Sequence, residues 1–453
     1  MIDMTRGNIT KGMLAFSVPL VFANIFQQLY GVMSTIIVGR YLGKEALAAT
    51  GTAIPFMNIM MFLLVGMTMG ASILMAEYFG SGDSARLKRE IATSVAAGTV
   101  FTAALSFAAL LCIHPALRLI NTPQSIVPQA ASYLRIVFAG LIFTFLYNIY
   151  SSALRSIGES VVPLYLLVFS SLLNIVLAIV FVGRLGFGVE GAAYATVISQ
   201  AAAAIACFVY IRVKVPSLDV RLRDMKIDPE LLSKTSSYSW ISGIQQTFLY
   251  LGIFMLQGAV NSLGIDSIAA FNATSRIDSL VMAPSDSLAL ALMMFISQNN
   301  GAGAKARIRA GLMRSCLMNY AYTLSAAALL FFMSGDMISL FLNSGETVAL
   351  SLGAHYLKLM SLFYLLSAFC NTFQGFFRGI GKMDVTLYAT LIQIPIRVGL
   401  AYLLAGYIGI DAVAVAIAVG WVFMAGYQIF EYVRYAREAW DGKDGLSLLK
   451  DGL

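Results

Sequence analysis

Long apolar runs recur along the whole chain, separated by short polar or glycine-containing segments. A helix of about 20 apolar residues crosses a bilayer whose hydrocarbon core is about 30 Å thick. The runs are longer than barrel strands and lack alternation, so they favour helices over a membrane barrel. The pattern predicts twelve membrane-spanning helices, near residues 13–38, 48–77, 92–113, 128–152, 162–182, 189–212, 237–260, 268–299, 311–333, 351–376, 385–405 and 411–436.

One stretch of the chain repeats itself about half a chain later. Residues 42–49 (LGKEALAA) return as residues 263–270 (LGIDSIAA), 221 positions further on. The same offset relates two more pairs of segments, 80–86 with 301–307 and 188–190 with 409–411. Because six spans return each copy to its starting side, the copies have the same orientation. The sequence therefore predicts an all-α membrane protein of two parallel six-helix lobes, related by a pseudo-two-fold axis along the membrane normal.

The most polar long stretch divides six spans from six. Within it, Asp228 followed by Pro229 predicts a helix start, with the aspartate as N-cap and the proline in the first turn. The predicted organisation is an N-lobe of residues 1–212, a cytoplasmic linker of 213–236, a C-lobe of 237–436 and a cytoplasmic tail of 437–453.

Composition and charge agree with a membrane location. The chain is 59% apolar and 12% charged, against roughly 45–50% and 25% for soluble domains. Most of its basic residues fall in alternate loops and at the ends, so the net charge of +7 indicates topology rather than nucleic-acid binding. Positive residues stay in the cytoplasm, and we expect both termini there, in a multi-pass protein of the prokaryotic inner membrane that works as a monomer.

Sequence motifs of enzymes and metal sites are missing. The four cysteines stand singly in apolar runs, and the two histidines are isolated near span ends. No cleavable leader is expected, since the first apolar run is too long and no small-residue cleavage site follows it. These observations predict a protein that is not an enzyme and has no cofactor or bound metal.

The eighth predicted span carries unusual charge. It contains Arg276, Asp278 and Asp286, with Pro284 between the two acids. Acids eight positions apart differ in direction by about 80° on a straight helix, so they share one broad face. Arg276 does not face Asp278, because residues two apart point in different directions. Either the acids pair with Arg276 or Arg397 inside the bundle, or they bind H⁺, Na⁺ or a cationic substrate.

Uncharged polar residues provide further candidates for a binding cleft. They either hydrogen bond to a substrate between the lobes or hold helices together. Asn174 and Arg397 occupy related places in the two halves, 223 positions apart. The set of candidate binding residues comprises Asp278, Asp286, Arg276, Arg397, Asn174, Gln245, Gln246, Gln28, Tyr30 and Gln200.

Several short segments, in this order and with the internal repeat, resemble the multidrug and toxic compound extrusion (MATE) family over residues 10 to 436. They are Val38–Gly43 (VGRYLG), Leu154–Gly158 (LRSIG), Gly188–Thr196 (GVEGAAYAT), Arg276–Ser279 (RIDS) and Arg378–Lys382 (RGIGK). The resemblance implies two six-helix lobes and a secondary transporter that exports amphipathic, cationic compounds in exchange for H⁺ or Na⁺ by alternating access. A flippase or exporter of a lipid-linked or anionic solute is the alternative, because Arg276 and Arg397 can bind phosphate.

The chain departs from its relatives at the acids of the first lobe. Many members carry an acid where this chain has Ser34, and another four residues after Asn174, where it has Ala178. An acid near Gln245 and Gln246 is also missing. The resemblance therefore implies that Asp278 and Asp286 are the membrane acids left for ion coupling.

Overall fold

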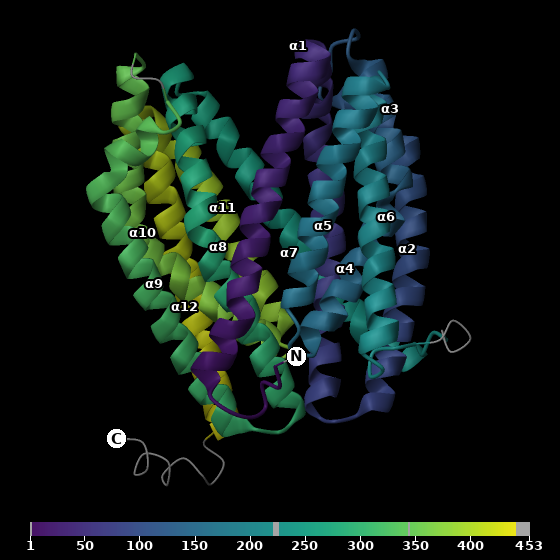
Figure 1. Cartoon of the computed structure of the whole chain (residues 1–453). Helices are drawn as coiled ribbons and strands as arrows, with labels where there is room; N and C mark the ends of the chain where they lie inside the picture. Colours follow the sequence, from purple (N-terminus) through teal and green to yellow (C-terminus); the bar gives the residue numbers. More distant parts are fainter. Residues whose placement is uncertain (1, 221–225, 343–344, 441–453) are drawn as a thin grey trace. The chain divides into compact units, whose positions relative to one another are not determined.

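A computed structural model of the chain describes residues 2–220, 226–342 and 345–440, and it is helical almost throughout (Figure 1). The elements are α1 Ile9–Gly80, α2 Ser84–Leu119, α3 Val127–Ala139, α4 Leu141–Ser156, α5 Val161–Ala178, the π-helical η1 Ile179–Arg184, α6 Gly188–Lys214, α7 Pro229–Asn261, α8 Ile265–Gly301, α9 Lys305–Ser339, α10 Thr347–Gly379, α11 Met383–Ile408 and α12 Asp411–Trp440. Within the described residues, nine helices are long and apolar enough to cross a membrane, and α3 with α4 makes a tenth, bent by 44°. The predicted all-α membrane fold is confirmed.

Every predicted span is helical, although four of the twelve differ in form from the expectation. The first two spans belong to the 72-residue α1, whose helical geometry breaks only at Gly43 (φ 78°, ψ −169°). The fourth span is divided at Gly140 between α3 and α4, and the fifth ends in the π-helical η1. The chain thus departs from straight helical geometry at Gly43 and Gly140. The hydropathy pattern shows only a gap between two apolar runs at the first glycine and no interruption at the second.

The sequence repeat is also a repeat of backbone conformation. Pairs of glycines 221 positions apart adopt nearly the same positive φ: Gly43 and Gly264 (78° and 92°), Gly82 and Gly303 (74° and 69°), and Gly188 and Gly409 (63° and 60°). Residues with a Cβ rarely adopt this conformation, so glycine is needed at each turn. The offset read from the sequence therefore relates equivalent turns of two similar structures.

Two glycines make reciprocal contacts where α1 ends and where α8 ends. A Cβ atom added to Gly80 would lie 1.9 Å from the carbonyl oxygen of Gln298, and one added to Gly301 would lie 1.9 Å from that of Glu77. Gln298 follows Glu77 by the same 221 positions that separate the glycines. A contact in which each element presents the same residue to the other indicates two-fold symmetry.

The chain forms two compact units. The first contains Met1–Tyr250, Asp286–Arg314 and Gly379–Gly381, and the second contains Leu251–Ser285, Ser315–Arg378 and Lys382–Leu453. Helices α7, α8 and α9 each contribute to both units. The division into lobes at residues 212 and 237 follows the repeat instead, and it stays a prediction.

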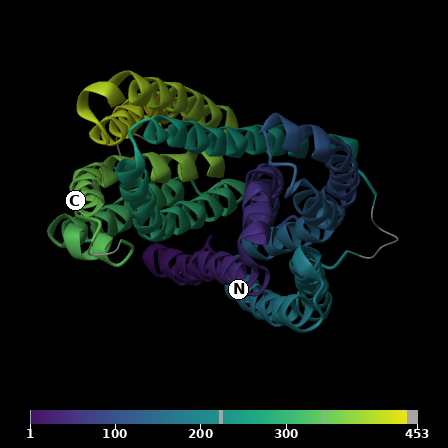
Figure 2. The same cartoon turned by 90° about the horizontal axis from the view of Figure 1, so that it is seen from above.

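Each unit has its own apolar core. In the first unit, α6 packs on α3, α4 and α5, and α1 packs on α4 and α5. In the second unit, α11 and α12 pack along each other, as the yellow-green and yellow helices show in Figures 1 and 2. Large apolar side chains such as Phe107 (65% exposed) and Leu111 (66% exposed) point outward from α2. Outward apolar faces of this kind suit contact with lipid rather than water.

The helix start predicted in the linker is confirmed. Helix α7 begins at Pro229, directly after Asp228. The Asp228 carboxylate accepts hydrogen bonds from the backbone N–H groups of Glu230 (3.1 Å) and Leu231 (3.3 Å). This cap satisfies donors that have no partner within the helix, and it determines where the second half of the bundle begins.

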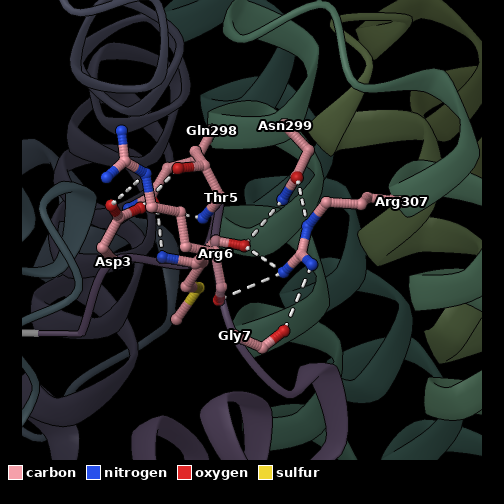
Figure 3. Close-up of polar contacts among 8 residues, drawn as sticks. Asp3, Thr5, Arg6, Gly7, Gln298, Asn299 and Arg307 are labelled. Atoms are coloured by element: carbon pink, nitrogen blue, oxygen red, sulfur yellow. Dashed lines mark hydrogen bonds and ion pairs between the residues drawn. The ribbon is translucent and has the colours of Figure 1, made fainter.

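The segment before α1 is tied to the end of α8 (Figure 3), and it is also tied to the turn after α4. The backbone N–H of Met4 donates to Gln298 Oε1 (3.1 Å), and Asn299 Nδ2 donates to the Met4 carbonyl (3.0 Å). Gln298 Nε2 also donates to the carbonyl of Ser156 (2.7 Å), and the N–H of Ile2 donates to that of Gly158 (3.1 Å). One segment thereby joins helices from both copies of the repeat.

Arg307 holds the same segment by its carbonyl groups. The guanidinium donates to the carbonyl oxygens of Met4 (3.1 Å), Arg6 (3.2 Å) and Gly7 (3.2 Å). Its Nε also donates to Asn299 Oδ1 (3.1 Å), which orients the group (Figure 3). The planar donor fork of arginine suits several acceptors at once.

The equivalent arginine of the first copy has a different role. Arg86 Nε lies 3.5 Å from Asp83 Oδ2 in an exposed ion pair. The position equivalent to Asp83 in the second copy is Ala304, so Arg307 has no such acid beside it. Loss of one acid thus distinguishes two otherwise equivalent turns.

The glycine contacts lead to a stability prediction. Gly80→Ala and Gly301→Ala should each lower the midpoint of thermal unfolding in detergent by a similar amount, because each methyl group meets a backbone carbonyl that cannot rotate away. Overpacking of this kind costs about 1–3 kcal/mol. Gly51→Ala is the control, since nothing lies within 4 Å of an added Cβ there. Equal midpoints for all three variants would contradict the reciprocal contact.

The anchoring of the N-terminal segment can be tested by hydrogen–deuterium exchange. Arg307→Ala should speed exchange of the backbone amides of residues 2–8, because three carbonyl groups lose their donor. Each such hydrogen bond contributes about 1.5–3 kcal/mol when one partner is charged. Arg86→Ala removes the equivalent arginine, whose partner is an exposed acid, and should leave this segment unchanged. The same exchange in both variants would show that Arg307 is not the anchor.

Candidate functional site

In the second unit, an acid on α8 faces two tyrosines of α10. The Asp278 carboxylate accepts a hydrogen bond from the hydroxyl of Tyr364. Asp278 is half-buried, whereas Tyr364 and Tyr356, two helical turns earlier, are buried. Helix α10 therefore places both hydroxyl groups on the side from which α8 presents its acid.

Tyr356 lies near both the acid and a buried arginine of α11. It is close enough to Asp278 and to Arg397 for electrostatic interaction with both. Its hydroxyl group has no hydrogen-bond partner among the described residues. The Tyr356 hydroxyl is thus a buried polar group, without a hydrogen-bond partner among the described residues, that is close to two opposite charges.

Arg397 is buried without a matching acid. It is 8% exposed, and its Nε and Nη2 atoms have no hydrogen-bond partner within the described residues. The guanidinium lies against α7 at Gly252, where an added Cβ would be 2.7 Å from Nη2. Burying a charge without a partner destabilises the fold by several kcal/mol. An anionic group bound here would accept hydrogen bonds from the unpaired nitrogen atoms and offset this cost.

Asp278 does not form either ion pair that was weighed from the sequence. In the described part of the chain, no ion pair joins it to Arg276 or Arg397. Arg276 is exposed on α8. The only polar partner seen for Asp278 is the neutral Tyr364, which leaves its negative charge uncompensated.

The second acid, Asp286, lies just after Pro284 and is exposed. The residues on either side of it are held by amides. Ser285 Oγ accepts from Asn371 Nδ2 of α10 (3.4 Å) in the second unit. Ser287 Oγ accepts from Asn24 Nδ2 of α1 (3.2 Å) in the first unit. The neighbours of Asp286 are thus fixed, while its own side chain faces outward.

In the first unit, predicted polar residues gather around Thr196 of α6. Asn174 of α5 is buried and donates from Nδ2 to Thr196 Oγ1 (3.2 Å). The Tyr30 hydroxyl of α1 forms a hydrogen bond with Thr196 as well. Gln200, one turn further along α6, has a buried Oε1 atom without a partner in the described chain. The group contains three of the predicted residues and no charge.

The place of a missing acid in this unit is filled by apolar packing. Ala178 lies one turn after Asn174 and is 3% exposed. It packs in one cluster with Ile37 of α1 and Ala195 of α6. An acid here would have to displace these contacts, so the unit is built for a neutral site.

The remaining predicted residues lie in the first unit. Gln245 is almost fully buried on α7, and Gln246 beside it is half-buried. Gln28 is half-buried on α1, and both Gln28 and Gln245 are engaged in interactions. Near them, Asn58 Nδ2 donates to the Tyr250 hydroxyl (3.4 Å).

Sequence reasoning missed the two tyrosines of α10. Tyr356 and Tyr364 stand in an apolar run, where a tyrosine is also an ordinary core or interface residue. The one available signal was that Tyr356 and Tyr364 are eight positions apart, as Asp278 and Asp286 are, which indicates that the two tyrosines lie on one face of their helix. Buried Glu90 was missed too, because it precedes its predicted span by two positions.

Comparison with known proteins identifies the class of this molecule. The MatE family model matches residues 19–180 and 240–403, one match in each copy of the repeat. The chain therefore belongs to the MATE family of transporters, and it is a multi-pass membrane protein.

Individual relatives match between 60% and 96% of the chain. Probable multidrug resistance protein YoeA of Bacillus subtilis is 29% identical over 94% of this chain and 95% of its own length. A FAD transporter of Shewanella oneidensis is 24% identical over 60% of this chain and 62% of its own length. A MOP superfamily transporter of Pyrococcus furiosus has the same two-lobed fold, with a TM-score of 0.88, 24% identity and coverage of 96% and 98%. These relatives are transporters rather than enzymes.

Paired tyrosine variants test the Asp278 cluster. Tyr364→Phe should lower the midpoint of thermal unfolding, because it leaves a partly buried carboxylate without its donor, at a cost of about 1–3 kcal/mol. Tyr356→Phe should be neutral or stabilising, since it removes a hydroxyl group that has no partner. Unfolding followed by circular dichroism in detergent measures both. A larger loss for Tyr356→Phe than for Tyr364→Phe would contradict the assignment of partners.

Proposed function

We propose that this chain exports amphipathic organic cations in exchange for H⁺ or Na⁺, by exposing a binding site to each side of the membrane in turn. The observation that carries the proposal is the environment of Asp278, a partly buried carboxylate whose polar partner is a neutral tyrosine. A carboxylate paired with arginine would already be neutralised, whereas this one is available to a cation. Proton and cationic substrate can then compete for one acid.

The neutral group around Asn174 supports a division of roles. Its amide and hydroxyl groups can hydrogen bond to a substrate but cannot balance a charge. Ion coupling therefore falls to α8, and we propose Asp278 as its principal residue, with Asp286 as an exposed acid near the path. We also propose cytoplasmic termini and a monomer, in the plasma membrane of a prokaryote.

An anionic substrate is the second candidate, and a specific observation favours it. Buried Arg397 has two nitrogen atoms without partners, and a guanidinium of this kind suits phosphate or carboxylate. A relative named as a FAD transporter carries a substrate that contains phosphate. The two candidates differ in which residue binds: Asp278 for a cation, and Arg397 for an anion.

Transport by the purified chain in proteoliposomes decides between them. With a cationic dye and separate H⁺ and Na⁺ gradients, Asp278→Asn should abolish gradient-driven efflux, because a neutral amide cannot exchange a cation. Asp266→Asn is the matched control, since this exposed acid at the start of α8 undergoes the same change. Wild-type efflux that ignores both gradients would overturn the coupling. Uptake of FAD that requires Arg397, with no movement of the dye, would establish the second candidate instead.

A further inference from the structure

A buried acid at the start of α2 takes no part in the site described above. Glu90 is fully buried, with 0% exposure. Its Oε1 atom accepts hydrogen bonds from Ser94 Oγ on the same helix (2.8 Å) and from Thr235 Oγ1 on α7 (2.7 Å). Its Oε2 atom is buried and has no hydrogen-bond partner among the described residues.

Among the described residues, no basic side chain forms an ion pair with Glu90. Arg89, its neighbour, lies 3.5 Å from Asp228 instead. Lys234 of α7 attracts the Glu90 carboxylate and Asp228, the residue before α7, repels it, both through space, and Tyr78 of α1 interacts with it in the same way. An ionised carboxylate buried in this way costs several kcal/mol. A proton on Glu90 removes that cost and leaves Oε1 free to accept its two hydrogen bonds.

Glu90 belongs to a contact between the two copies of the repeat, because α2 comes from the first and α7 from the second. The backbone N–H of Asp228 donates to Thr93 Oγ1 (3.1 Å), and Arg89 reaches the Asp228 carboxylate. With the bond from Thr235, these contacts join the first turns of α2 and α7. All of them lie within the first unit.

A cavity lies directly beside this contact. Its volume is about 240 Å³, and it is lined by hydroxyl groups of Ser94, Thr235 and Ser239 and by the rings of Phe101 and Trp240. Since one water occupies about 30 Å³, the cavity has room for several. Ser94 and Thr235 line this cavity and also donate hydrogen bonds to Glu90. The carboxyl group therefore lies next to a space large enough to admit water.

We propose that Glu90 is a proton-binding site that controls the contact between α2 and α7. With the proton bound, the two helices stay together. When the contact opens, water reaches the carboxyl group, its O–H bond breaks, and the proton passes to water. Since the closed contact binds the proton and the open one releases it, the contact is stable at low pH and weakens as pH rises. This goes beyond exchange at Asp278 and does not depend on the substrate.

Hydrogen–deuterium exchange of the full chain tests the proposal. The ratio of the exchange rates of the wild type and Glu90→Gln in residues 84–98 and 229–242 should be about tenfold larger at pH 8 than at pH 6. The glutamine is permanently neutral and keeps an oxygen that accepts from Ser94 and Thr235. Comparing chains at one pH cancels the intrinsic pH dependence of exchange. Glu230→Gln, an exposed acid one residue into α7, should behave as the wild type.

Either of two results overturns the proposal. In the first, the wild type and Glu90→Gln have the same exchange rates at both pH values. In the second, their exchange rates differ by the same factor at both pH values. A second measurement needs no variant. Dicyclohexylcarbodiimide adds to protonated carboxyl groups, so at pH 6 it should label Glu90 at least about tenfold more than exposed Glu230. Equal labelling would show that Glu90 does not hold a proton. Neither readout requires transport, so a failure here is distinct from a failure of coupling at Asp278.

Discussion

The close approach of backbone to backbone at Gly80 and Gly301 is the contact on which the two-fold construction depends. Each glycine admits a carbonyl group from the other copy's helix, and the two contacts are related by the offset of the sequence repeat. Because no side chain intervenes, the geometry leaves little freedom. This fixed approach sets the distances at which nearby polar contacts form, including those of the Met4 segment and those of Glu90.

On this symmetric frame the chemistry is unequal. The first copy gathers Tyr30, Asn174 and Thr196 in a neutral group, with an apolar cluster around Ala178. The second copy has an acid, Asp278, and an arginine, Arg397, that both lie near Tyr356 and form no ion pair with each other in the described part of the chain. A duplicated scaffold thereby carries two different polar environments, one neutral and one charged.

Hydropathy and the internal repeat were sufficient to predict the helices, because bilayer thickness and backbone hydrogen bonding restrict a membrane chain to few forms. They could not predict the bend at Gly140 or the π-helical end of α5, since these arise from local packing. For the candidate site, the cost of burying charge singled out Asp278 and Arg397 from the sequence, and their role in binding stays a prediction. It could not show that they stay apart, because the partner of Asp278 is Tyr364, a residue type equally common in ordinary cores.

Arg307 shows how a duplicated protein acquires a new attachment once one copy changes. Arg86 forms an ion pair with Asp83. Arg307 has Ala304 in the equivalent place, and it donates instead to carbonyl groups of the segment before α1. Residues 2–7 thus form a defined part of the first unit, although the hydropathy pattern predicts no structural element there. For anyone producing this protein, affinity tags and fluorescent fusions belong at the other end of the chain.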